Sequence, residues 1–108
     1  MIAEALLNYE FDGVVATNTT VDRSSIVYEK NAHQEGGLSG APLCKKSTEV
    51  ITLLNECLGD KMPIIGVGGI TSVIDGKRKL EAGAQLLQLY TGFIYEGLPL
   101  IKDLAKIK

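Results

Sequence analysis

The sequence contains few of the residues that form reaction centres. One histidine, His33, and two cysteines, Cys44 and Cys57, occur among 108 residues. His33 has no partner at a spacing typical of a catalytic pair, and the cysteines lack C-x-x-C spacing. Cys44 lies near a predicted helix start, where a thiol pKa can fall, but a buried packing role is favoured. We therefore expect two structural thiols in a reduced, cytosolic-side protein.

Excess positive charge and long apolar runs are also missing, and each absence excludes a class of protein. The net charge is -2, so the basic surface typical of nucleic-acid binding is not expected. No apolar run approaches the roughly 20 residues of a membrane span, and no basic region followed by an apolar stretch indicates a signal peptide. An apolar content of 45% and a charged content of 22% predict one soluble domain with a real core.

Short apolar runs alternate with helical patterns, which predicts an α/β fold. Strands are expected at 13–17, 63–68 and 86–89, and segments of this kind are typical of parallel sheets covered by helices. The sheet is expected to be doubly wound or barrelled. Residues 2–7 suit the end of a helix, and further helices are expected from Pro42 to a stop at Gly59 and over 72–82. The helix before Gly59 has one apolar face, made by Val50, Ile51, Leu54, Cys57 and Leu58. A last amphipathic helix carries Leu100, Ile101, Leu104 and Ile107.

Two stretches are predicted to be irregular. Residues 21–40 show no clear period, and an unstructured loop of about 20 residues in a compact domain is usually functional. Residues 90–97 are expected to form a short, turn-rich connection.

The second strand ends on paired glycines, which allows two interpretations. The segment 63–70 runs Pro-Ile-Ile-Gly-Val-Gly-Gly-Ile, and Ser72 and Asp75 follow at the spacing of a helix-capping box. A dinucleotide fingerprint is disfavoured because Thr71 stands where its third glycine belongs. The glycines either form a tight turn or, with the next strand end, cradle a phosphate, and spacing alone favours neither. The backbone amides of the predicted cradle belong to Gly68, Gly69, Tyr90 and Thr91.

A polar cluster follows the first strand. Thr17, Asn18, Thr19 and Thr20 lie at its predicted carboxyl end, and the Asn18 carboxamide suits a planar amide or carboxylate ligand. A capped polar turn is the alternative. The sequence shows no nucleophile–base pair, no metal-ligand cluster and no convincing general base at a strand end, so no catalytic residue is assigned.

Four segments together resemble class 2, quinone-dependent dihydroorotate dehydrogenase. They are Gly-Val-Val-Ala-Thr-Asn-Thr-Thr with Asp-Arg at 13–23, Gly-Gly-Leu-Ser-Gly-Ala-Pro-Leu at 36–43, the glycine-ended strand at 63–70, and Leu-Tyr-Thr-Gly-Phe at 89–93. The resemblance covers essentially the whole chain and corresponds to the C-terminal part of that enzyme.

The resemblance implies an FMN-binding (β/α)8 barrel. A barrel takes roughly 250 residues, so residues 1–108 would be a C-terminal segment of the barrel domain holding about three βα units. The family's serine base lies on an earlier strand, so the isolated chain is expected to be inactive. The FMN-contacting positions would be Thr17, Gly40, Gly69, Tyr90 and Thr91, joined by Gly68 of the predicted cradle, and Asn18 and Thr19 would hold the orotate ring and carboxylate.

The same resemblance implies partners and a location. The whole enzyme would oxidise dihydroorotate to orotate in pyrimidine synthesis and reduce a quinone. It would be peripheral on the cytoplasmic side of a bacterial inner membrane, or on a mitochondrial inner membrane, attached through N-terminal elements that this soluble segment lacks. Two alternatives remain: a non-enzymatic module that binds a phosphate or nucleotide, and a structural fragment that self-associates through open sheet edges.

Overall fold

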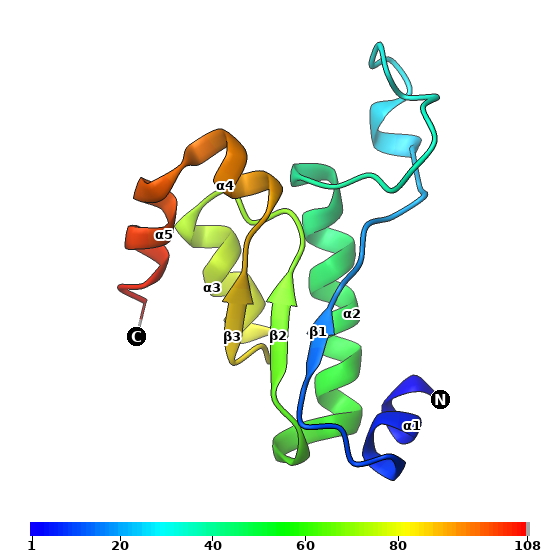
Figure 1. The fold of residues 1–108 in the computed structure, drawn as a ribbon, viewed down its shortest axis with the longest axis vertical. Coiled ribbons are helices and arrows are strands. Elements are labelled where there is room, and N and C mark those ends of the chain that lie inside the picture. The colour runs from blue at the N-terminus through cyan, green and yellow to red at the C-terminus, as the bar shows by residue number, and fades with distance from the viewer. Residues whose placement is uncertain (108) are drawn as a thin grey trace.

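A three-stranded parallel sheet forms the centre of the computed structural model, which describes residues 1–107 (Figure 1). Strands β1 (Val14–Ala16), β2 (Ile64–Val67) and β3 (Leu86–Gln88) lie side by side in sequence order. Val15 pairs with Ile65, and Ile65 pairs with Leu86. All three predicted strands are therefore present, and each is shorter than expected.

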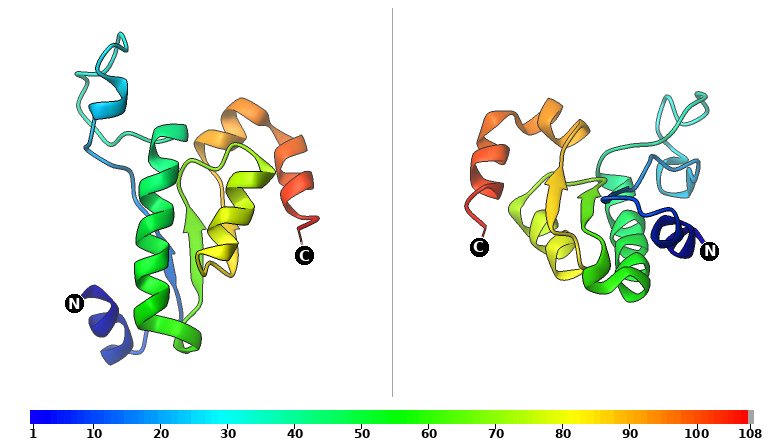
Figure 2. Two further views of the ribbon diagram at one scale, coloured as in Figure 1. Left: turned by 180° about the vertical axis from the view of Figure 1, so that it is seen from behind. Right: turned by 60° about the horizontal axis from the view of Figure 1, so that its bottom comes forward.

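Helices cover only one face of this sheet. Helix α2 (Cys44–Leu58) links β1 to β2, and α3 (Val73–Glu81) links β2 to β3. Both helices pack on the same side (Figure 2). A doubly wound sheet carries helices on both faces, so that option is excluded for the described residues, and the one-sided arrangement is the one found in barrels.

The other face of the sheet is open. Side chains alternate between the two faces along a strand, and Ala16 and Ile64 accordingly face the helices and are buried. Val15 and Leu86 point the other way and are 51% and 61% exposed. Because Val15, Ile65 and Leu86 are paired in register, they form an apolar row across this open face.

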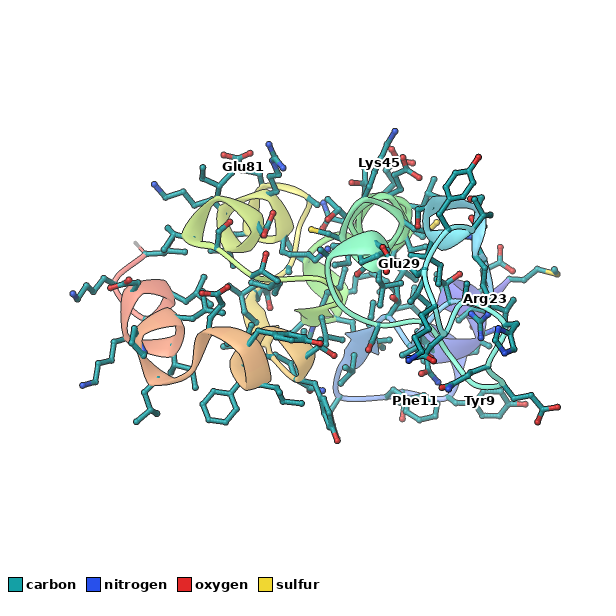
Figure 3. The ribbon with its side chains drawn as sticks, turned by 90° about the horizontal axis from the view of Figure 1, so that it is seen from above. Tyr9, Phe11, Arg23, Glu29, Lys45 and Glu81 are labelled. Carbon is teal, nitrogen blue, oxygen red and sulfur yellow. The ribbon has the colours of Figure 1, made fainter. Side chains whose placement is uncertain are left out.

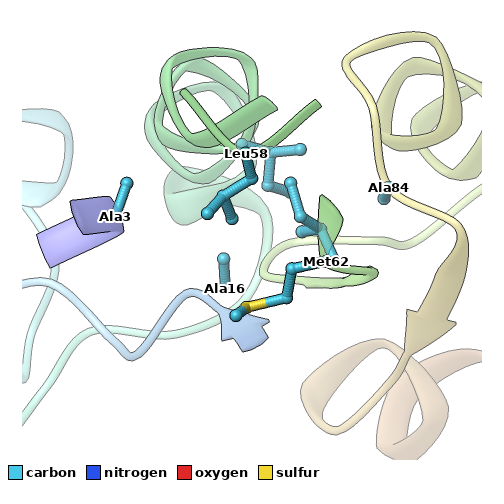
Figure 4. Packing of buried hydrophobic residues seen from close by; sticks show 7 residues of the cluster. Ala3, Ala16, Leu58, Met62 and Ala84 are labelled. Atoms are coloured by element: carbon cyan, nitrogen blue, oxygen red, sulfur yellow. The ribbon is translucent and has the colours of Figure 1, made fainter. Parts of the chain in front are cut away.

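The core lies between the sheet and α2. Helix α1 (Ile2–Asn8) closes its lower end against α2, as expected for residues 2–7. A smaller apolar cluster joins Ile70 to Leu100 and Leu104 of α5 (Leu98–Leu104). The main cluster comprises Ala3, Ala16, Ile51, Leu58, Met62, Ile64 and Ala84 (Figure 4).

The buried face of α2 matches the predicted one in part. Ile51 and Leu58 are buried and Leu54 packs against the core, whereas Val50 and Cys57 are exposed. The pattern missed the first inward residue because it is polar: the buried Ser47 hydroxyl donates to the carbonyl of Val67. The prediction of a structural role for both thiols is therefore wrong for Cys57.

The segment after β3 is helical rather than turn-rich. Helix α4 (Thr91–Glu96) leads directly into α5. The pattern failed because α4 is short and exposes Phe93, Ile94 and Tyr95, so it has no apolar stripe facing a core. Helix α5 ends at Leu104, before the predicted Ile107.

The segment 21–40 extends away from the sheet as an arm (Figure 1). A backbone bridge between Thr20 and Leu38 closes its base. Arg23 holds the arm together, since its Nη2 donates to the carbonyls of Gln34 at 2.8 Å and Gly36 at 2.6 Å. Figure 3 shows Arg23 in this arm, on the side of the molecule away from Glu81.

Candidate functional site at the carboxyl ends of the strands

A cavity of about 240 Å³ lies where the three strands end. It is lined by all eight residues that the sequence singled out for cofactor or substrate binding, drawn from all three strand ends and from the segment before α2. These residues are Thr17, Asn18, Thr19, Gly40, Gly68, Gly69, Tyr90 and Thr91. Their convergence follows from parallel topology, since the carboxyl ends of parallel strands meet at one edge of the sheet.

The loop after β2 begins with Gly68 and Gly69 and is called the glycine loop. Its main chain alone forms one wall of the cavity. Gly68 and Gly69 have φ angles of 129° and 69°, in the region that side chains disfavour. A Cβ atom on Gly69 would lie 2.5 Å from the backbone nitrogen of Cys44, and one on Gly68 would lie 2.7 Å from the Ser47 hydroxyl oxygen. The loop therefore runs directly against the first turns of α2, with no room for a side chain.

Helix α3 begins immediately after this loop, as the capping spacing predicted. The Ser72 hydroxyl accepts a hydrogen bond from the Asp75 amide at 3.2 Å. The Asp75 carboxylate accepts from the amide and the hydroxyl of Thr71, both at 3.1 Å. Burial opposes ionisation of Asp75, but the hydrogen bonds from Thr71 and Ser72 outweigh it and hold the pKa below its usual value. Thr71 and Asp75 thus tie the glycine loop to α3.

The polar cluster after β1 forms a network of local hydrogen bonds. The Thr17 hydroxyl donates to the Asn18 carbonyl at 2.9 Å, and the Thr19 amide donates to Asn18 Oδ1 at 2.8 Å. The Thr17 amide donates to the Val67 carbonyl at 2.9 Å, which joins the ends of β1 and β2. The peptide between Ala16 and Thr17 is cis. These bonds use the Asn18 oxygen and leave its Nδ2 amino group available as a donor, and Asn18 lines the cavity.

The third wall joins segments far apart in the sequence. The Thr91 hydroxyl donates to Ser39 Oγ at 2.9 Å, and a Cβ on Gly40 would lie 3.2 Å from Thr91 Cγ2. Tyr90, at the cavity rim, is 75% exposed. Ser39 was not predicted as a site residue, although its position beside Gly40 in the Gly-Gly-Leu-Ser-Gly run was a signal.

Two buried polar residues behind the glycine loop were also missed. Ser47 and Lys79 are both fully buried. Ser47 had no signal beyond its helical position, and a lysine in a helix is usually solvated. His33, in contrast, is exposed on the arm and does not line the cavity.

The described residues hold neither a metal cluster nor a helix that could span a membrane. Within 1–107, no group of three or more His, Cys, Asp or Glu side chains is arranged to hold a metal ion. None of the helices described is both long enough and apolar enough to pass through a bilayer.

The sheet has helices on one face and a cavity walled by main chain at its strand ends. This arrangement is typical of α/β proteins that bind ligands at the carboxyl ends of parallel strands. Comparison with known sequences identifies the family. Residues 1–107 match the family model of dihydroorotate dehydrogenase, and the chain belongs to that family.

Relatives and solved structures agree with this assignment. The chain is 56% identical over 105 residues to a dihydroorotate dehydrogenase (quinone) of Vibrio parahaemolyticus, covering 97% of this chain and 31% of the relative. It is 54% identical over 104 residues to the enzyme of the same name from Escherichia coli O1:K1, covering 96% and 31%. A crystal structure of DHODH from Eimeria tenella in complex with ferulenol superposes with a TM-score of 0.87 at 33% identity, over 95% of this chain and 28% of the other. The chain thus spans about a third of the length of the relatives it matches.

Proposed function

We propose that this chain is the C-terminal segment of a quinone-dependent dihydroorotate dehydrogenase barrel and forms the phosphate end of its FMN site. The observation that carries the proposal is the convergence of the eight predicted residues on one cavity. Because 1–108 corresponds to about a third of its relatives, the segment would supply about three of the eight βα units.

The residues fit the phosphate end of a flavin nucleotide. Gly68 and Gly69 leave a wall of main chain whose amides can approach an anion closely, and Thr91 adds a hydroxyl. The cavity of about 240 Å³ is smaller than the roughly 300–1,000 Å³ of a complete small-molecule site. That size supports a partial site, which the remainder of a barrel would complete. When bound, FMN supplies the electron transfer from dihydroorotate to the quinone.

Asn18 and Thr19 would hold the substrate in this proposal. The Asn18 Nδ2 group can donate to a carboxylate or ring carbonyl of orotate, since its oxygen is already used by the Thr19 amide. The Thr19–Asn18 contact fixes the carboxamide orientation before the substrate arrives. These residues position the substrate and move no proton.

The isolated chain is expected to be catalytically inactive, because its cavity holds no general base. Quinone reduction and membrane association would belong to the remaining part of the enzyme. Purified 108-residue chain mixed with FMN, dihydroorotate and a soluble quinone is therefore expected to form no orotate. Orotate formation above that of the same mixture without the chain would contradict this part of the proposal.

The phosphate site itself can be tested by comparing FMN with riboflavin, which lacks the phosphate. Each is titrated into the 108-residue chain while flavin fluorescence is followed. We expect FMN to bind more tightly than riboflavin, and inorganic phosphate to compete with FMN. A Gly69→Ala variant is expected to lose the FMN preference, whereas Gly36→Ala, on the arm, keeps it. Equal binding of FMN and riboflavin, or no binding of FMN, would contradict the phosphate cradle in this segment.

A further inference from the structure

A buried amine and a thiol face each other behind the glycine loop. Lys79, on the inner side of α3, is 0% exposed. Its Nζ donates to the Cys44 carbonyl at 2.8 Å and to Thr48 Oγ1 at 2.6 Å, and lies 3.9 Å from Cys44 Sγ. Neither side chain has a role in the proposed FMN or orotate contacts. The pair is therefore a separate cluster with chemistry of its own.

Burial shifts both groups toward their neutral forms. Burial lowers the pKa of the Lys79 amine, while the Cys44 thiol and Asp75 carboxylate oppose that shift. Burial raises the pKa of the Cys44 thiol, so the lowered value considered from its helix-start position is not found. Among residues 1–107, no carboxylate lies within ion-pair distance of Lys79. A neutral amine carries the lone pair that bond formation at nitrogen requires.

Within residues 1–107, the side-chain amine in contact with Cys44 Sγ is that of Lys79. Cys57 lies on the same helix 13 residues further along, which places it about 20 Å away at 1.5 Å per residue. That distance excludes a disulfide between the two cysteines. Cys44 is only partly buried, so the oxidant that reaches it must be small.

We propose that hydrogen peroxide links Cys44 to Lys79 through an oxygen atom, forming an N–O–S bridge between α2 and α3. The contact of 3.9 Å between Nζ and Sγ carries the proposal. An inserted oxygen spans this gap with less movement than a direct S–N bond needs.

The reaction uses two molecules of peroxide. The first oxidises the thiol to a sulfenic acid: the S–H and O–O bonds break, an S–O bond forms and one water leaves. The second peroxide takes two electrons from the sulfenic acid and the amine together. The O–H bond of the sulfenic acid, one N–H bond of the amine and the O–O bond of the peroxide break. A bond forms between the sulfenic oxygen and the lysine nitrogen, and two waters leave. Sulfur and nitrogen are oxidised, and peroxide is reduced. The chain gains one oxygen and loses two hydrogens.

The bridge is tested by mass spectrometry of the 108-residue chain carrying Cys57→Ser, which removes the exposed thiol. After peroxide treatment we expect an intact-mass gain of one oxygen minus two hydrogens, and a proteolytic peptide that joins the segments containing Cys44 and Lys79. Thiol reductant is expected to restore the original mass and the alkylation of Cys44.

Matched variants separate the bridge from ordinary cysteine oxidation. In the Cys57→Ser background, Cys44→Ser is expected to give no shift, and Lys79→Arg or Lys79→Met is expected to add whole oxygens at Cys44 without a cross-link. Circular dichroism shows which Lys79 variant keeps the fold, and either one suffices. The same chain in concentrated urea should form no bridge, because the pair is then apart.

Three results would overturn the proposal. The first is a folded Cys57→Ser chain that gains only whole oxygens. The second is a loss of two hydrogens without added oxygen, which would indicate a direct S–N bond. The third is an equal yield of bridge in urea, which would show that the folded contact has no part in the reaction.

Discussion

The buried Ser47 hydroxyl donates a hydrogen bond to the carbonyl oxygen of Val67, the last residue of β2. That oxygen also accepts from the Thr17 amide at 2.9 Å. One carbonyl therefore ties α2, β1 and β2 together at the start of the glycine loop. The position of the cavity wall depends on this junction.

Replacement of Ser47 by alanine tests the junction. Val67 keeps its bond from Thr17, so no carbonyl is left unsatisfied, and we expect a loss of about 1 kcal/mol in the free energy of unfolding. Urea denaturation followed by circular dichroism measures it. Ser25→Ala, at an exposed position, is the control and should change stability by less than about 0.5 kcal/mol. Equal losses in both variants would show that the Val67 contact carries no stability.

Gly69→Ala tests how tightly the loop is packed. A side chain there would be strained by the φ angle of 69° and would contact the Cys44 backbone. We expect a loss of about 2–5 kcal/mol, combining backbone strain with overpacking. Gly36→Ala separates the two causes, because Gly36 also has a positive φ but has open space around it. Its loss should be about 1–2 kcal/mol, and a loss as large as that of Gly69→Ala would refute the packing argument.

Acid stability is expected to depend on Asp75. Hydrogen bonds from Thr71 and Ser72 overcome burial and lower its pKa in the folded state. A carboxylate with a depressed folded pKa contributes stability above its unfolded pKa of about 3.9, and this contribution is lost as pH falls through the folded value. Asp75→Asn should therefore narrow the difference in stability between neutral and acidic pH.

The control for this measurement is Asp103→Asn, on an exposed surface of α5. Urea midpoints are determined from neutral pH down to below the ordinary carboxyl range. An acid dependence that is the same in Asp75→Asn and in the parent chain would be evidence against this linkage.

Self-association through the open sheet face is the fourth expectation. Val15, Ile65 and Leu86 form an apolar row on that face, and the outer edges of β1 and β3 are unpaired in the described sheet. Two copies of the chain could bury these rows against each other. Leu86→Lys should shift the chain toward monomer in sedimentation velocity experiments.

Leu53→Lys is the matched control, because Leu53 is as exposed as Leu86 but lies on the outer side of α2. If the parent chain remains monomeric at high concentration, or if both substitutions act alike, the sheet face is not the contact.

Much of this fold could be predicted from local sequence, because each strand is a short apolar run ended by glycines or polar residues. Parallel topology then places the strand ends together, which is why the eight residues predicted to bind ligands line one cavity. Helix α4 could not be predicted, since its apolar side chains face solvent. The buried Lys79 was also beyond reach, because its partner is a carbonyl on a different helix, and only tertiary contact reveals such a bond.

The order of the strands has a consequence for how the chain acquires its structure. The chain between the paired residues Ile65 and Leu86 is short and contains only α3. The chain between Val15 and its partner Ile65 is longer, because it contains the arm and the whole of α2. Closing a longer loop costs more entropy, and low sequence separation speeds folding. The unit from β2 to β3 is therefore the expected nucleus, and β1, which is followed by Thr17 and Asn18, docks onto a glycine loop that has already formed.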